Sequence, residues 1–113
     1  MLGEKMTQYP KDTDPFPIKP NLSQAKFSPG QLVSTPGAME IMIAHKCSPL
    51  EFLARHLTGD WGIVAPEGSK LNNEALKYGH RLHSIYQIAP QKTIWLITEA
   101  NRSATTFLLP SEY

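Results

Sequence analysis

The sequence of 113 residues has a single cysteine, Cys47, and no long apolar run. One cysteine cannot form an internal disulfide, so the chain gains nothing from an oxidising compartment. No stretch approaches the roughly 20 apolar residues of a membrane-spanning helix, and the first twenty residues lack the apolar segment of a signal peptide. We therefore expect a cytoplasmic protein with no membrane partner.

The chain also has almost no excess of positive over negative charge, because 11 Lys and Arg against 10 Asp and Glu leave a formal net charge of +1. The total predicts no strong attraction to nucleic acid, although it does not exclude a local basic patch. The sequence has neither a glycine-rich phosphate loop nor a nucleophile elbow, which argues against an enzyme with a nucleotide-binding fold. We also expect no cofactor. From Lys26 on, the basic side chains are scattered and form no run: Lys26, Lys46, Arg55, Lys70, Lys77, Arg81, Lys92 and Arg102.

Proline, by contrast, is concentrated near the N-terminus. Each proline removes a backbone donor and favours extended backbone before it. The first 26 residues also hold few apolar side chains, so they cannot drive their own folding. We predict an extended or disordered arm over residues 1–26 and a single α+β domain over residues 27–113. If the arm has a function, the hypothesis is that it wraps the domain or a partner. The prolines of the arm are Pro10, Pro15, Pro17 and Pro20.

Apolar residues at helical spacing predict helices in the first half of the domain. The first helix begins after Thr35, a suitable N-cap followed by proline, and runs to about residue 45. The second begins after Ser48, again followed by proline, and ends before Gly59. The third is predicted over about residues 70–78. The fold class is therefore two to three short helices followed by a sheet.

The last third of the chain changes to short runs rich in β-branched and aromatic residues. These runs cover residues 81–88, 92–99 and 103–110, and turn-sized connectors separate them. They predict a three-stranded antiparallel meander, with Gln31 to Ser34 as an alternative fourth strand at one edge. The middle run is apolar on both faces, which we interpret as a central strand covered by helices. Helices followed by strands give an α+β domain.

The stretch RHLTGDWG combines residue types used in catalysis with residue types used in turns. His56 and Asp60 can transfer protons or bind metal at neutral pH. The same stretch also fits a loop that folds itself: Gly59 ends a helix, Asp60 accepts backbone hydrogen bonds, and Trp61 covers the core. We favour the structural interpretation and keep the wall of a functional site as the alternative.

The soft and borderline metal ligands do not have the spacing of a zinc site. His45, Cys47, His56, His80 and His83 are dispersed, whereas zinc sites use tight pairs of cysteines and histidines. Only the pair at positions 80 and 83 has helical spacing, and it crosses from the end of a helix into a strand. We therefore predict no metal site and interpret Cys47 as an inert residue between helices.

A further constellation lies on the predicted sheet. Arg81 and His83 share one face of the first long strand, and the turn TEANR carries Glu99 and Arg102. Several small ribonucleases use such a face, where a carboxylate or histidine abstracts the 2′-hydroxyl proton and arginine offsets charge on the phosphate. A surface pair of Arg81 with Glu99 is the alternative, since the spacing is not diagnostic. The ribonuclease hypothesis assigns catalytic roles to His56, Asp60, Arg81, His83, Glu99 and Arg102.

Four stretches carry a resemblance to a known group of proteins: FSPGQLVSTPGAMEIM, PLEFLARHLTGDWG, NNEALKYGHRLHSIY and IWLITEANRSATTFLLPSEY. From Phe27 to Tyr113 the chain resembles small, uncharacterised bacterial proteins that are often associated with plasmids or mobile elements. Some of these proteins are labelled plasmid-related proteins or type I restriction methylase subunits. The mobile-element context of these similar proteins is compatible with a role in host defence or counter-defence, and the resemblance implies no defined reaction.

These features favour a small binding or inhibitor module that acts on a protein or nucleic-acid partner. The residues predicted to bind are Trp61, Arg81, Arg102 and Tyr113, and we expect Tyr113 to pack near the GDWG loop. A metal-independent ribonuclease or phosphodiesterase is the alternative, so the sequence leaves open whether the protein is an enzyme. A homo-oligomer formed through a strand edge or the arm is a third hypothesis.

Overall fold

The computed structural model describes residues 4–5 and 23–113. Most of the predicted arm therefore lies outside the described residues, and the arm and domain boundary stay a prediction. No helix in this part of the chain is long and apolar enough to cross a membrane. The helices are α1 (Pro36–Ala44), α2 (Pro49–Leu57) and α3 (Pro66–Tyr78), with a short 3₁₀ helix, η3 (Pro110–Glu112), near the C-terminus. The strands are β1 (Glu4–Lys5), β2 (Gln31–Ser34), β3 (Leu82–Ala89), β4 (Lys92–Thr98) and β5 (Ala104–Leu108).

Local signals explain where the helices begin. The Thr35 hydroxyl accepts a hydrogen bond from the Ala38 amide at 3.1 Å, and the Ser48 hydroxyl accepts one from the Leu50 amide at 3.2 Å. These caps confirm the predicted starts of α1 and α2. The third helix begins at Pro66, four residues before its predicted start. Its N-cap is an alanine that provides no side-chain hydrogen bond, so the sequence lacked the usual signal.

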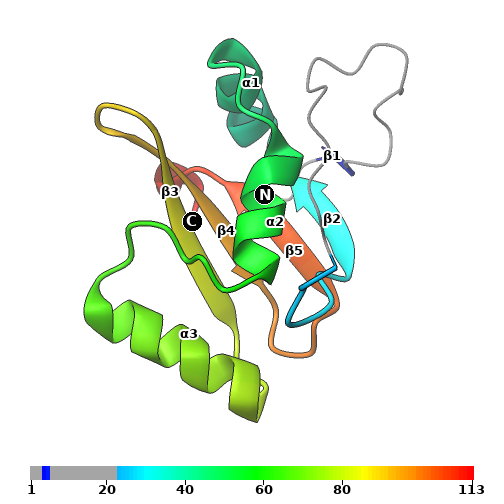
Figure 1. Cartoon of the computed structure of the whole chain (residues 1–113). Helices are drawn as coiled ribbons and strands as arrows, with labels where there is room; N and C mark the ends of the chain where they lie inside the picture. The colour runs from blue at the N-terminus through cyan, green and yellow to red at the C-terminus, as the bar shows by residue number, and fades with distance from the viewer. Residues whose placement is uncertain (1–3, 6–22) are drawn as a thin grey trace.

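The sheet is mixed and has the order β1-β2-β5-β4-β3. The last three strands form the predicted antiparallel meander. The prediction of a purely antiparallel sheet was wrong, because β2 pairs with β5 in parallel. The chain leaves β2, passes through the helices to the far edge of the sheet, and meanders back until β5 lies beside β2 (Figure 1). A parallel neighbour needs such a long crossover, which no local turn signal reveals.

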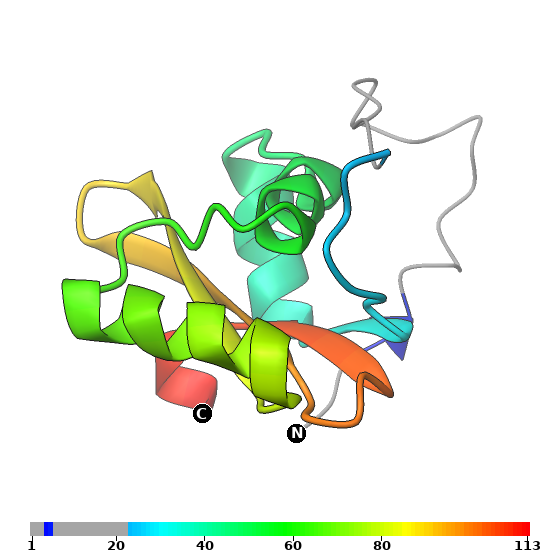
Figure 2. The same ribbon diagram turned by 60° about the horizontal axis from the view of Figure 1, so that its bottom comes forward.

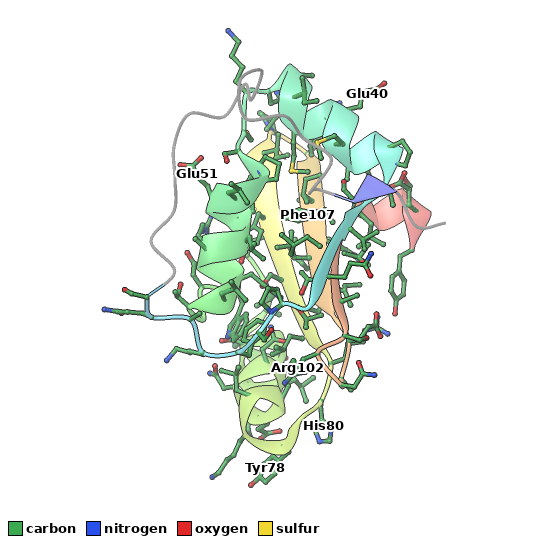
Figure 3. The ribbon with its side chains drawn as sticks, turned by 90° about the vertical axis from the view of Figure 1, so that its right-hand side faces the viewer. Glu40, Glu51, Tyr78, His80, Arg102 and Phe107 are labelled. Carbon is green, nitrogen blue, oxygen red and sulfur yellow. The ribbon has the colours of Figure 1, made fainter. Side chains whose placement is uncertain are left out.

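From the apolar faces of β4 we had inferred that helices cover both faces of the sheet. The structure differs, because the helical cover lies mainly on one face. In Figure 2, α1 and α2 lie on one side of the sheet and η3 lies on the other. Phe107 points into the space between α2 and the sheet (Figure 3), where it is fully buried. Buried side chains from α1, α2 and the strands join it in one core cluster, which includes Met42, Leu57, Tyr86 and Leu96. The face opposite α2 has no layer of α-helices in the described chain, although η3 lies on this side and α3 lies beside the β3 edge.

The outer edge of β3 is already hydrogen-bonded. Ile85 donates from its amide to the Trp61 carbonyl at 3.0 Å and accepts from the Ile63 amide at 2.8 Å. Asn72 of α3 bonds to both the amide and the carbonyl of His83, at 3.0 and 2.7 Å. These bonds occupy part of the edge that a strand-edge dimer would use.

Candidate functional site

His56 lies in the interior, on the α2 side of the sheet, with no exposed surface. Its Nδ1 is 2.6 Å from the Ser84 hydroxyl and its Nε2 is 2.8 Å from the Thr98 hydroxyl. The Thr98 hydroxyl is in turn 2.6 Å from that of Thr105, which donates to the Pro29 carbonyl at 2.8 Å. This chain of bonds ties α2 to β3, β4, β5 and the segment before β2. Both nitrogens of the imidazole are thus used in holding the fold together.

The environment of His56 also keeps its ring neutral. Burial lowers the pKa of His56 to about 3, with a smaller contribution from the nearby charges of His83 and Arg102. The rings of Phe27 and Trp61 pack edge-on against the imidazole, with centroids 5.3 and 5.8 Å away. A ring with this pKa and no access to solvent is not placed to exchange protons with a substrate at neutral pH.

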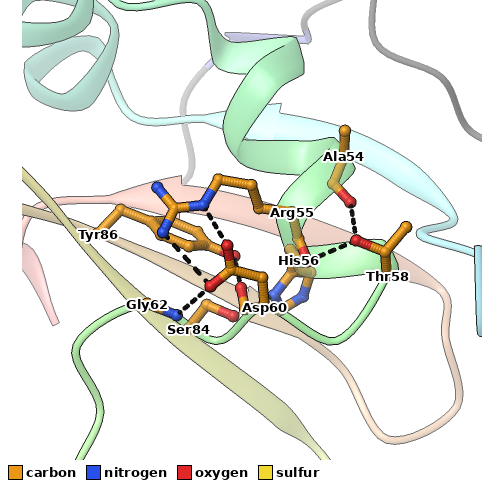
Figure 4. Close-up of polar contacts among 8 residues, drawn as sticks. All are labelled: Ala54, Arg55, His56, Thr58, Asp60, Gly62, Ser84 and Tyr86. Carbon is orange, nitrogen blue, oxygen red and sulfur yellow. Dashed lines mark hydrogen bonds and ion pairs between the residues drawn. The ribbon is translucent and has the colours of Figure 1, made fainter.

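Asp60 and its neighbours form the loop that follows α2 (Figure 4). The Asp60 carboxylate accepts from Arg55 Nε at 2.7 Å and from the Gly62 amide at 3.1 Å. The hydrogen bond from Arg55 is the main cause that lowers the pKa of Asp60. Trp61 is only 5% exposed and packs in a core cluster with Leu82. These contacts are the ones that the structural interpretation of RHLTGDWG as a self-folding loop expects.

Arg102 acts as a clamp that joins the C-terminal end of α3 to the β4–β5 turn through backbone carbonyls. Its Nη1 donates to the carbonyls of His80, Glu99 and Ala100, at 2.7, 3.1 and 3.1 Å, and its Nη2 donates to that of Ala75 at 3.0 Å. Figure 3 shows Arg102 between the β4–β5 turn and α3. The guanidinium is thus committed to joining these two elements.

This geometry makes a prediction for the conservative variant Arg102→Lys. Lysine keeps the charge but loses the planar fork that reaches several carbonyls at once. We expect the free energy of unfolding to fall by roughly 1–2 kcal/mol, close to the loss from Arg102→Ala. Urea titrations of the three proteins measure it. Full stability in Arg102→Lys would show that charge alone matters and would contradict the clamp.

The remaining candidates lie on the sheet face opposite α2, which we call the open face. Arg81 donates a hydrogen bond to the Tyr113 hydroxyl, and its guanidinium lies 5.3 Å from the centroid of the Tyr113 ring. The Tyr113 ring packs against Trp95 at 5.3 Å, and Trp95 packs against His83 at 4.4 Å. The register of β3, β4 and β5 completes the open face, which consists of Arg81, His83, Ile85, Trp95, Ile97, Thr106, Leu108 and Tyr113.

Two hollows have Arg81 in their lining. The first hollow, of about 200 Å³, includes Arg81, Ile97, Glu99, Leu108, Glu112 and Tyr113 in its lining. The second, of about 290 Å³, lies between the open face and α3 and includes Val64, Leu71, Arg81, His83 and Ile85. Nε2 of His83 is buried and has no hydrogen-bond partner in the described chain. Burial is also the main cause that lowers the pKa of His83.

Comparisons with known proteins give no family or function for this chain, so the interpretation of the site depends on the geometry described above. No family model, curated protein or solved structure matches the chain. The resemblance to plasmid- and mobile-element-associated proteins therefore stays a prediction. Among residues 4–5 and 23–113, no group of three or more His, Cys, Asp or Glu side chains is placed to hold a metal ion.

The structure divides the residues selected from the sequence into two sets. Arg81, Glu99 and Tyr113 meet in the first hollow, and His83 lines the second. The expectation that Tyr113 packs near the GDWG loop was wrong, since it contacts Arg81 and Trp95. The other candidates hold the fold on the far side of the sheet or at its end: His56, Asp60, Trp61 and Arg102.

The residues of this surface that sequence reasoning did not select include Trp95, Ile97, Leu108 and Glu112. The alternation of Trp95 and Ile97 along β4 could have revealed two of them. The others depend on how the chain folds back after β5, where the Glu112 carboxylate accepts from the Thr35 hydroxyl at 2.6 Å and from the Leu109 amide at 2.8 Å. This long-range contact positions η3 and the C-terminal tyrosine.

Proposed function

We propose that the protein is a non-catalytic binding module that presents its open face to another protein. The observation that carries the proposal is the cluster of Arg81, Trp95 and Tyr113 beside two hollows on a sheet face without a layer of α-helices in the described chain. Arginine, tryptophan and tyrosine are the residue types that contribute most to protein–protein binding energy. Tyr113 is 69% exposed, so it is accessible to a partner.

The apolar surface beside this cluster extends the candidate interface. Leu71 of α3 is 65% exposed and lines the second hollow with Ile85. Ile63, next to Val64 of the same hollow, is 57% exposed. Apolar surface that surrounds aromatic and arginine anchors fits a protein interface, where burial excludes water from the central contacts.

The charges of the open face favour a protein over a nucleic acid. Arg81 is the cation that lines the hollows, whereas Glu99 and Glu112 bring carboxylates to the first of them. Binding to a phosphate backbone depends on several lysines or arginines acting together. With a formal net charge of +1 for the chain, a protein partner is the better match.

A metal-independent ribonuclease or phosphodiesterase is a second candidate, because Arg81 and Glu99 line the same hollow. It would use Glu99 as the base and Arg81 on the phosphate. Cleavage of RNA or DNA by the purified protein, lost in both Arg81→Ala and Glu99→Gln, would establish this reaction. That result would contradict the proposal of a non-catalytic module. We expect no cleavage above that of a mock preparation.

The binding proposal is tested by comparing three forms of the full chain in capture from an extract of the host. These are the wild type, the double variant Arg81→Ala/Tyr113→Ala, and the control Glu51→Gln. Glu51 points away from the domain on α2, on the opposite side of the sheet (Figure 3). We expect a protein that the wild type and the control retain and the double variant loses. Equal retention by all three folded forms, or no retained protein at all, would contradict the proposal.

A further inference from the structure

The first hollow has both apolar and charged parts. Ile97 and Leu108 are 4% and 8% exposed and supply its apolar surface. The ring of Tyr113 forms part of the wall, and Arg81 donates a hydrogen bond to the hydroxyl of that ring. A ligand that fills this hollow therefore needs an apolar stem as well as a polar end.

The charges of the hollow do not cancel. One cation, Arg81, and two carboxylates, Glu99 and Glu112, leave a formal charge of −1. Glu112 already accepts hydrogen bonds from the Thr35 hydroxyl and the Leu109 amide. The Glu99 carboxylate has no hydrogen bond or ion pair to any of residues 4–5 and 23–113, and only the backbone of Glu99 is bonded, to Arg102 and Ala104.

We propose that the first hollow binds a lysine or arginine side chain of the partner protein, with its charged end on Glu99. This inference rests on the proposed function and specifies its chemistry. Long basic side chains carry an aliphatic stem, which packs on Ile97 and Leu108, and a cationic end, which pairs with the carboxylate. An acidic side chain would meet two carboxylates, and an apolar one would leave Glu99 without a partner while displacing its water.

The aromatic wall supports the same choice. A cation over a tyrosine ring is attracted by the negative face of the ring, and Arg81 already uses Tyr113 in this way. Arg81 is anchored by its bond to the Tyr113 hydroxyl, which keeps the ring in place beside the hollow. A planar guanidinium from the partner can also bond to the Glu99 carboxylate with two parallel N–H groups.

Three capped tripeptides serve as probes: Ac-Ala-Arg-Ala-NH₂, Ac-Ala-Nle-Ala-NH₂ and Ac-Ala-Glu-Ala-NH₂. Each is titrated into the ¹⁵N-labelled full chain while amide NMR shifts are followed. We expect saturable shifts at Thr106, Leu108 and Tyr113 with the arginine peptide, at roughly millimolar affinity, and no saturation with the other two. Glu99→Gln should weaken arginine-peptide binding at least about fivefold, whereas Glu51→Gln should leave it unchanged.

The outcomes separate this inference from the proposed function. Equal binding of the three peptides, or no shift at the first hollow, would overturn the inference even if the capture experiment succeeds. Arginine-peptide binding to an open face that captures no partner would instead count against the proposed function. Tighter peptide binding by the full-length variant Lys11→Gln/Lys19→Gln would assign the hollow to this chain's own N-terminal segment, and would also overturn the inference.

Discussion

His56→Ala is expected to lower the free energy of unfolding by about 4 kcal/mol at pH 7. The substitution opens a cavity in a fully buried position, removes the imidazole partner of the Ser84 hydroxyl, and leaves the Thr98 hydroxyl with that of Thr105 alone. Urea denaturation followed by tryptophan fluorescence measures the change. The exposed His45 gives a matched control, and His45→Ala should change the free energy by less than about 0.5 kcal/mol.

The same histidine should make the protein sensitive to acid. Its pKa is about 3 in the folded state and 6.5 in its unperturbed form, so between these values the unfolded chain binds a proton that the folded chain does not. His56 therefore does not lower the free energy of unfolding above about pH 6.5. Below that pH it lowers this free energy by up to about 1.4 kcal/mol per pH unit, as the pH decreases towards 3. His83, whose pKa is also lowered, contributes in the same direction.

A non-titrating variant isolates the contribution of His56. His56→Gln removes the proton-binding group, so its stability should fall less steeply than that of the wild type between pH 6 and pH 4. Parallel curves for the two proteins would mean that His56 is already protonated in the folded state. That result would contradict a neutral imidazole that forms hydrogen bonds through both of its nitrogens.

Gly62→Ala is the second substitution with a large expected effect. Gly62 has a positive φ of 78°, and a Cβ at this position would lie 1.8 Å from the Ile85 carbonyl oxygen. The added methyl group would push the loop off the edge of β3 and break the backbone bonds that Ile85 makes there. We expect a loss of at least about 3 kcal/mol, since steric overlap adds to the backbone strain of a left-handed alanine.

Gly79 provides the control for Gly62. It has nearly the same φ, 75°, but a Cβ there would meet no atom within 4 Å. Gly79→Ala therefore measures the backbone strain alone, which we expect to cost about 1 kcal/mol. Equal losses in the two variants would show that the close contact with Ile85 relaxes without cost, and that the loop is not fixed against β3.

Signals carried by neighbouring residues were sufficient for much of the fold. Thr35 and Ser48 mark the starts of α1 and α2 because each needs only its own hydroxyl and an amide two or three residues later. The glycines of the RHLTGDWG loop likewise reveal their turns, since positive φ angles are a local requirement. The meander of β3, β4 and β5 followed from short connectors and the composition of its strands.

Features that depend on distant residues were not accessible in this way. The parallel pairing of β2 with β5 joins segments about 70 residues apart, and no residue type specifies it. The first hollow depends on the contact of Glu112 with Thr35, which brings the C-terminus back beneath the sheet. The residue type of His56 is equally compatible with proton transfer and with a structural role, and its hydrogen bonds to β3 and β4 depend on residues that are distant in the sequence.

The two sides of the sheet thus have different roles in the proposed account. On the α2 side, the hydrogen bonds of His56 join α2 to β3 and β4. On the open face, Tyr113 contacts both Arg81 and Trp95 in the unbound protein. A prearranged surface loses less conformational entropy on binding, which suits a small module with a limited interface.

The central claim is that the open face is the binding surface, and two tyrosines of similar exposure test it directly. Tyr113 on the open face is 69% exposed, and Tyr78 at the end of α3 is 64% exposed. Isothermal titration of the purified partner with the wild type, Tyr113→Ala and Tyr78→Ala gives the three dissociation constants. The account predicts at least about tenfold weaker binding for Tyr113→Ala and no significant change for Tyr78→Ala. Unchanged affinity in a folded Tyr113→Ala variant, or an equal loss in both, would contradict it.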